Sequence, residues 1–339
     1  MIKYNMEKLS TAESNQQTRS VQSEFKGLLE DLSAEVLGQE TLLNRMLIAL
    51  LAEGHLLVVG APGLAKTTAI KALARRIEGT FHRIQFTPDL LPSDLTGTDI
   101  YRPTQGDFKF QPGPLFHHFL LADEINRAPA KVQSALLEVM AEKQITVGQH
   151  TYDMPELFLV MATQNPIDHE GTYALPEAQL DRFLMEVKIT YPDREKEQEI
   201  LRLVRAQRRA DCKAHDNDDI ISQKRLFEAR REVLDIHLST ALESYMVELV
   251  VSSRDPSHYD EKLKLYIQYG ASPRGTIALE HCARAHAWLA GQDYVAPADI
   301  HAVAADVLRH RLILSYEALA DGVSVEDYIE RLLQLVPVP

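Results

Sequence analysis

One short segment of this chain carries the residue types that bind phosphate groups. It follows the apolar run Leu56–Val59 and precedes apolar residues at helical spacing, and it reads Gly60-Ala61-Pro62-Gly63-Leu64-Ala65-Lys66-Thr67. A glycine-containing loop between a strand and a helix lets several backbone N–H groups point at one anion, and the helix dipole strengthens the attraction. Lys66 would reach the β- and γ-phosphates of a nucleotide, and Thr67 would ligate Mg²⁺. Thr68 is the last residue of the segment that we expect to bind the nucleotide.

The loop departs from the usual phosphate-loop pattern at one position. The pattern G-x-x-x-x-G-K-S/T has its second glycine where this chain has Ala65. We expect the methyl group to be tolerated if the φ angle of Ala65 is negative. The alternative is an ordinary glycine-containing turn with Lys66 in solvent.

Two acidic residues end a second apolar run. Phe119–Ala122 is followed directly by Asp123 and Glu124, and ligands of parallel α/β sheets bind at the carboxyl ends of the strands. Asp123 would hold Mg²⁺ and Glu124 would polarise an attacking water. The alternatives are a solvated acid pair or an acidic cap of the next helix.

Three more polar residues are candidates whose roles the residue types leave open. Asn165 follows the apolar stretch Leu157–Thr163, where it would orient a water or touch the γ-phosphate; a turn before proline is the alternative. Arg182 and Arg274 would each stabilise transition-state charge if they lay near the γ-phosphate. Surface ion pairs are the alternative for both.

Alternating strand-like and helix-like segments must position these residues. The strand-like runs are Leu56–Val59, Phe81–Phe86, Phe119–Ala122 and Leu157–Ala162. With helices between them, they predict a parallel sheet covered by helices on both faces. Asp99–Phe110 and Gln144–Tyr152 predict two hairpins. After Pro192 only helical patterns follow, including Pro297–Leu314 and Val325–Leu335, which predicts an α/β domain followed by an all-helical domain.

These patterns divide the chain into four parts. We expect a flexible lead-in over 1–28, an α/β core over 29–192, a connecting helix and linker over 193–225, and a helical domain over 226–339. The polar stretch 211–223 is the expected linker. Arg309-His310-Arg311 is expected to be a solvated helix end, with a neighbour's acidic surface as the alternative partner. The hairpin aromatics Tyr101, Phe108 and Phe110 favour cross-strand packing over a grip on a polypeptide.

The composition limits the kind of partner. The chain has 339 residues and a net charge of −13, with no dense Lys/Arg cluster, which makes nucleic-acid binding unlikely. Two cysteines, Cys212 and Cys282, and the lack of a leader-like start predict a reducing, cytoplasmic location. The apolar runs are too short to span a membrane.

Six ordered motifs together resemble those of the MoxR-type AAA+ ATPases of the helix-2-insert clade. They occupy residues 60–67, 86–97, 121–128, 162–166, 175–183 and 270–274, and the resemblance runs from about Gly38 to Arg311. It includes the alanine at position 65. The resemblance implies an AAA+ P-loop core with a parallel sheet, followed by an all-α lid domain, and it implies ATP and Mg²⁺.

The resemblance also implies roles for single residues. Asn165 matches the sensor-1 position, and Arg182 matches the arginine finger that acts on the ATP of a neighbouring subunit. Arg274 matches the sensor-2 arginine of the lid. Gly38 and Gln39 match the segment beside the adenine, and the two hairpins look like the insertions of this clade.

At the level of the whole protein, the resemblance implies a homo-oligomeric ring, usually a hexamer. ATP hydrolysis would drive chaperone-like remodelling, maturation or cofactor insertion of a client protein, often beside a von Willebrand factor A domain protein. A chelatase-type motor subunit for metal insertion is the alternative. A nucleic-acid motor fits less well because of the net charge of −13, and a slow nucleotide-gated scaffold fits poorly with the acid pair.

Overall fold

The computed structural model describes residues 20–339, except for 105, 149, 167–171 and 210–219. Most of the predicted lead-in and most of the predicted linker at 211–223 therefore lie outside the described residues. Residues 21–28 do not fit a flexible lead-in. They belong to helix α2, and Phe25 and Leu28 are buried, because Val21, Phe25, Leu28 and Leu32 repeat at helical spacing along one face.

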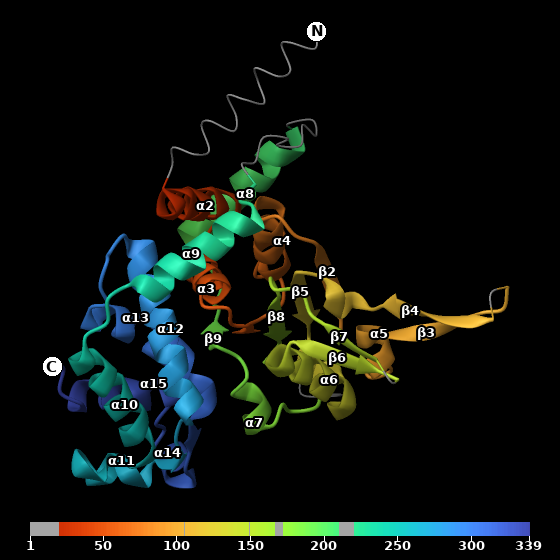
Figure 1. Cartoon of the computed structure of the whole chain (residues 1–339). Helices are drawn as coiled ribbons and strands as arrows, with labels where there is room; N and C mark the ends of the chain where they lie inside the picture. The colour runs from red at the N-terminus through yellow and green to blue at the C-terminus, as the bar shows by residue number, and fades with distance from the viewer. Residues whose placement is uncertain (1–19, 105, 149, 167–171, 210–219) are drawn as a thin grey trace.

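A five-stranded sheet with the order β2-β5-β8-β1-β9 forms the centre of the core, and all its neighbouring strands are parallel (Figure 1). The predicted parallel sheet is confirmed. The fifth strand, β9, was not predicted, because Met185 and Val187 alternate with the charged Glu186 and Lys188 at the edge of the sheet. The strands are β1 Leu56–Val59, β2 Phe81–Gln85, β5 Phe119–Asp123, β8 Leu159–Gln164 and β9 Met185–Lys188.

Helices cover both faces of the sheet, as predicted. Along β5, Phe119 and Leu121 join the hydrophobic cluster that contains α2, α3 and α4, whereas Leu120 and Ala122 join the cluster that contains α6. This alternation is what a strand buried on both faces requires. The helices of the core are α2 Val21–Glu35, α3 Glu40–Leu51, α4 Lys66–Arg76, α5 Pro92–Thr96, α6 Ala130–Glu142 and α7 Glu177–Leu180, with short 3₁₀ turns at Pro114–Phe116 and Ile125–Arg127.

Two antiparallel hairpins extend from the core on the side away from the lid helices (Figure 1). They are β3 Gly97–Arg102 with β4 Asp107–Pro112, and β6 Gln144–Val147 with β7 His150–Asp153, which confirms both predicted hairpins. Tyr101 and Phe108 face each other across the first hairpin with ring centroids 5.2 Å apart. Phe110 stacks on Tyr152 of the second hairpin at 4.2 Å. Tyr101 and Phe108 thus form the predicted cross-strand pair but stay exposed, whereas Phe110 packs between the two hairpins.

The C-terminal part is helical, with one exception. A short antiparallel ribbon, β10 Ile267–Tyr269 with β11 Ile313–Leu314, was not predicted. The expected helix Pro297–Leu314 ends instead at Leu308, because a 3₁₀ turn at Arg309–Arg311 redirects the chain into β11. The helices are α8 Arg194–Arg209, α9 Gln223–Asp235, α10 Thr240–Arg254, α11 Glu261–Leu265, α12 Pro273–Ala290, α13 Pro297–Leu308, α14 Tyr316–Ala320 and α15 Val325–Leu335, with a 3₁₀ turn at Pro256–His258.

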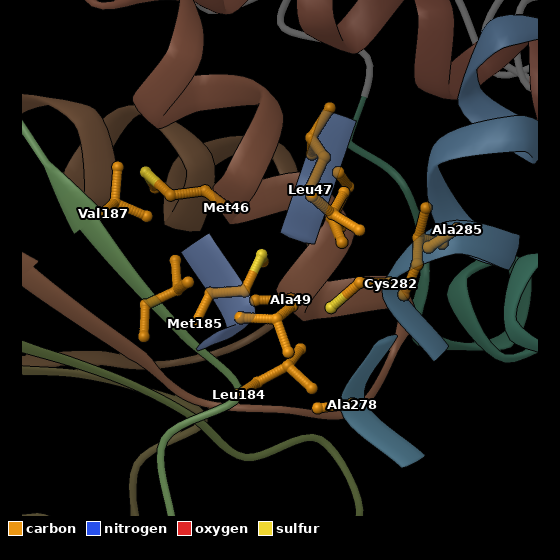
Figure 2. Packing of buried hydrophobic residues seen from close by; sticks show 14 of the residues in the cluster. Met46, Leu47, Ala49, Leu184, Met185, Val187, Ala278, Cys282 and Ala285 are labelled. Carbon is orange, nitrogen blue, oxygen red and sulfur yellow. The ribbon is translucent and has the colours of Figure 1, made fainter. Parts of the chain in front are cut away.

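One continuous hydrophobic cluster joins the sheet to the lid helices. Figure 2 shows α3 side chains such as Met46 and Ala49 together with Met185, the first residue of β9, and Leu184, which precedes it. Ala278, Cys282 and Ala285 of α12 complete the contact, and their small size lets the two helices approach closely. The lid is thus packed against the core by buried apolar area, the dominant favourable term in such contacts.

Candidate active site

The loop between β1 and α4 forms one wall of a pocket of about 370 Å³. Ala65 occupies the N-cap position of α4 and provides no capping side chain. The first N–H groups of the helix are thereby left for a ligand. The part of the loop and helix that lines the pocket is Pro62, Gly63, Leu64, Ala65, Lys66, Thr67 and Thr68.

The negative φ angle that we expected for Ala65 is wrong. Its φ angle is +57°, in the left-handed region, which costs a residue with a Cβ about 1–2 kcal/mol. The chain needs this conformation to turn from the loop into α4. Gly60, at the other end of the loop, is required for a different reason: a Cβ there would collide with a side-chain carbon of Ile189.

Lys66 is buried, and so it is not the solvated lysine of the alternative interpretation. Its Nζ donates a hydrogen bond to the carbonyl oxygen of Gly60 at 2.7 Å, and only 9% of the residue is exposed. Burial lowers the pKa of Lys66, whereas the carboxylates of Asp123 and Glu124 raise it. The same two carboxylates keep a positive charge favourable in the pocket.

The acid pair at the end of β5 is held by one threonine of the neighbouring strand β8. Thr163 Oγ1 donates to Asp123 Oδ1 at 2.6 Å and accepts from the backbone N–H of Glu124 at 3.0 Å. Glu124 has a φ angle of +57°, a strained conformation of the kind that occurs at functional sites. Thr163 was not predicted as a site residue, although it lies two residues before the predicted Asn165.

A second group of polar residues, also missed from the sequence, surrounds the acids. Arg83 on β2 donates to Asp123 Oδ2 at 2.6 Å from a terminal nitrogen and at 3.1 Å from Nε. Gln85, which lies opposite Asp123 in the sheet register, donates to Glu124 Oε2 at 2.9 Å, as does Arg127. The alternation of β2 places Arg83 and Gln85 on one face, but only the pairing of β2 with β5 reveals what they face.

The remaining predicted residues divide into two groups. Asn165 lines the pocket with the acids, whereas Arg182, Arg274 and the Gly38–Gln39 segment are not among its lining residues. Arg182 donates to the carbonyl oxygen of Leu137 at 2.6 Å, and Arg274 is exposed in the first turn of α12. Gln39 is buried at the start of α3, and a Cβ on Gly38 would lie 3.3 Å from Pro192.

The donor set of the pocket suits a hard divalent cation. The Thr67 hydroxyl and the Asp123 carboxylate line the same pocket, and Mg²⁺ prefers such oxygen ligands together with phosphate oxygens and water. When bound with a nucleotide, Mg²⁺ would neutralise charge that develops on the phosphate oxygens.

The glycine-containing loop, the acid pair and Asn165 lie together at the carboxyl edge of a parallel sheet. A helical lid follows this sheet in the chain. Together, this fold and this site are those of an ATPase of the AAA class. Residues 55–185 match the family of ATPases associated with various cellular activities (AAA), and residues 261–332 match the AAA lid domain. The Chaperone MoxR1 of Mycobacterium tuberculosis is 48% identical over 90% of this chain and 79% of its own length.

Two further similarities agree. Protein MoxR of Methylorubrum extorquens is 32% identical over 91% of this chain and 93% of its own length. A crystal structure of a Cytophaga hutchinsonii protein superposes with a TM-score of 0.86 at 45% identity, covering 98% of this chain and 99% of that one. The chain belongs to the MoxR family of AAA ATPases. Over the described parts of the chain, no helix has the length and apolarity needed to cross a membrane.

Proposed function

We propose that this ATPase hydrolyses ATP with Mg²⁺ and uses the energy to remodel or mature a client protein. The observation that carries the proposal is a single pocket lined by Lys66, Thr67, Asp123, Glu124 and Asn165, at the ends of β1, β5 and β8. These residue types are those that phosphoryl transfer to water needs: a cation for the phosphates, oxygen ligands for the metal, a base and an amide.

Each side chain has a task in this proposal. Glu124 polarises the attacking water, and the N–H groups at the start of α4 and Lys66 hold the phosphates. Thr67 and Asp123 hold Mg²⁺, and Asn165 orients the water or contacts the γ-phosphate. Gly38 and Gln39 lie beside the adenine.

The active form in this proposal is a homo-oligomeric ring, with a hexamer as the expected size. Arg182 lies outside the pocket of its own chain and partly buried against α6, which supports its action on the nucleotide of a neighbouring subunit. Arg274 of the lid would respond to the same γ-phosphate. An arginine that reaches the transition state from another subunit makes hydrolysis depend on assembly.

The work done on the client is chaperone-like in this proposal, because the similar protein from Mycobacterium tuberculosis carries the name Chaperone MoxR1. Remodelling, maturation and cofactor insertion are the forms that this work would take, with a von Willebrand factor A domain protein as partner and the cytoplasm as location. The similarity to MoxR proteins over nine-tenths of the chain favours this function over a chelatase motor, and stimulation of ATP hydrolysis by a porphyrin would reverse that ranking.

The test is ATP hydrolysis measured against protein concentration for the wild type, Glu124→Gln and Arg182→Ala. We expect the rate per subunit to rise with concentration. Glu124→Gln should bind ATP without turnover, and inactive Arg182→Ala should regain activity when mixed with inactive Glu124→Gln, because each supplies what the other lacks. A rate that is independent of concentration, together with a normal Arg182→Ala, would refute the shared site.

A further inference from the structure

Arg182 lies in the core, between two residues that are both hydrogen-bonded to the lid. The residues before and after it, Asp181 and Phe183, each accept hydrogen bonds from the 3₁₀ turn that follows α13. Arg309-His310-Arg311, the residues of this turn, were expected to be solvated. That expectation is wrong, because His310 and Arg311 are buried and Arg309 bonds to core and lid acceptors.

Arg311 makes the most extensive contact. Its Nε donates to Asp181 Oδ1 at 2.8 Å, and its terminal nitrogens donate to the carbonyl oxygens of Phe183 at 2.7 Å and Leu184 at 3.2 Å. Only 3% of its side chain is exposed. A planar guanidinium that uses several donors at once fixes both the distance and the orientation of its acceptors. The backbone around Arg182 is therefore fixed relative to Arg311.

The second oxygen of Asp181 connects to a different part of the lid. Ser272 donates to Asp181 Oδ2 at 2.8 Å, and the same hydroxyl accepts from the backbone N–H of Arg274 at 3.1 Å. Ser272 is the N-cap of α12. One carboxylate thus joins the start of α12, which carries Arg274, to the segment that carries Arg182.

His310 adds a contact that does not depend on charge. Its Nε2 donates to the carbonyl oxygen of Phe183 at 3.0 Å, and within the described chain its Nδ1 has no hydrogen-bond partner. Burial and the adjacent Arg311 lower the pKa of this imidazole well below its usual value, so it is neutral. The Arg182 side chain itself takes no part in these lid contacts and points its guanidinium to Leu137.

We propose that Asp181, held by Arg311 and Ser272, is a positioning residue that couples the orientation of the lid to the placement of Arg182 toward the neighbouring subunit. The inference rests on the proposed function, since it needs Arg182 to act across a subunit boundary. A change in lid orientation that moves Arg274 would move Ser272 with it. Asp181 would follow, and Arg182 would be displaced relative to the neighbour's nucleotide.

The test separates what a subunit donates from what it accepts. In Asp181→Asn the subunit's own pocket is intact, so mixing it with Glu124→Gln, which donates a normal arginine, should restore hydrolysis. The double variant Glu124→Gln/Asp181→Asn should rescue Arg182→Ala about tenfold less well than Glu124→Gln does, because a small misplacement of a catalytic group is costly. Glu177→Gln removes a nearby exposed charge on α7 and is the matched control, expected to donate normally.

Each outcome decides the question. Equal rescue by the single and double variants would overturn the coupling while leaving the shared site in place. Asp181→Asn that fails both as donor and as acceptor would also overturn it, since that pattern marks a merely structural residue. If Glu124→Gln itself fails to rescue Arg182→Ala, the proposed function fails and the inference falls with it. Should Asp181→Asn not fold, Ser272→Ala, which keeps the Arg311–Asp181 pair, should show a smaller donor defect of the same kind, and a normal donor would refute the coupling.

Discussion

Replacing Thr163 by valine should separate the two acids of the pocket from the strand that holds them. Thr163 is 1% exposed, and valine keeps its shape while removing the hydroxyl. The hydrogen bond to the Asp123 carboxylate involves a charged group and contributes about 1.5–3 kcal/mol, and the bond from the Glu124 N–H contributes about 1 kcal/mol. Water would replace part of this free energy, because 15% of the Asp123 side chain and 26% of the Glu124 side chain are exposed to solvent.

A net loss of about 2 kcal/mol remains, which corresponds to roughly a 30-fold lower kcat if the whole loss falls on the placement of Glu124 and Asp123. The loop that we propose to bind the phosphates is unchanged, so the Kd for an ATP analogue should stay within about twofold in the absence of Mg²⁺. The assay is steady-state ATP hydrolysis with parallel analogue titrations. Thr163→Ser, which keeps the hydroxyl, is the matched control and should retain most of the activity. A Thr163→Val protein with wild-type kcat would refute the role that we give to these two bonds.

Three other changes have defined outcomes. Arg83→Gln should lower the half-saturating Mg²⁺ concentration for hydrolysis by up to about fivefold, because a half-exposed ion pair of about 1 kcal/mol no longer competes for Asp123; a higher requirement would show that Arg83 helps the metal to bind. Burial lowers the pKa of His55 from 6.5 to about 4, so the unfolded chain binds the proton first and the free energy of unfolding falls by up to about 3 kcal/mol between pH 7 and pH 4. Urea titrations at several pH values measure this dependence. In His55→Asn the free energy of unfolding should fall less between pH 7 and pH 4 than in the wild type, and an equal fall would contradict the role of His55. Gly60→Ala should weaken ATP-analogue binding by displacing the loop, whereas Gly27→Ala, whose Cβ meets nothing within 4 Å, should bind normally.

The parts of the site that sequence predicts are those encoded by contiguous residues. The loop at 60–67 and the acids after Phe119–Ala122 are each one local pattern, a strand that ends in polar residues, and parallel-sheet geometry brings such ends together. Thr163, Arg83 and Gln85 belong to the site only because β8 and β2 are the neighbours of β5. Strand order is a long-range property, and the residue types alone did not predict it.

Two features of the core–lid junction, strand β9 and the buried turn after α13, were not predicted from the sequence for a related reason. Met185–Lys188 alternates apolar and charged residues, so Glu186 has the appearance of a surface residue in the sequence. In the structure its backbone oxygen accepts a hydrogen bond from Arg309 of the lid. In the same way Arg309-His310-Arg311 has the composition of a solvated helix end. Burial of so polar a turn is favourable only because carboxylate and carbonyl acceptors of the core already face it. Such a match between two distant segments is invisible in either segment alone.

Strained backbone at the pocket depends on the same long-range contacts. Ala65 and Glu124 both have φ angles near +57°, and both line the pocket, at a cost of about 1–2 kcal/mol each. Such conformations persist only where the surrounding structure imposes them. Thr163 does so for Glu124 through the backbone N–H, and the Lys66 bond to Gly60 closes the loop around Ala65. In the proposed function, the placement of Glu124 depends on Thr163 of a neighbouring strand, and the placement of Arg182 depends on the lid contacts of Asp181. Thr163→Val and Asp181→Asn should therefore lower turnover while the nucleotide still binds.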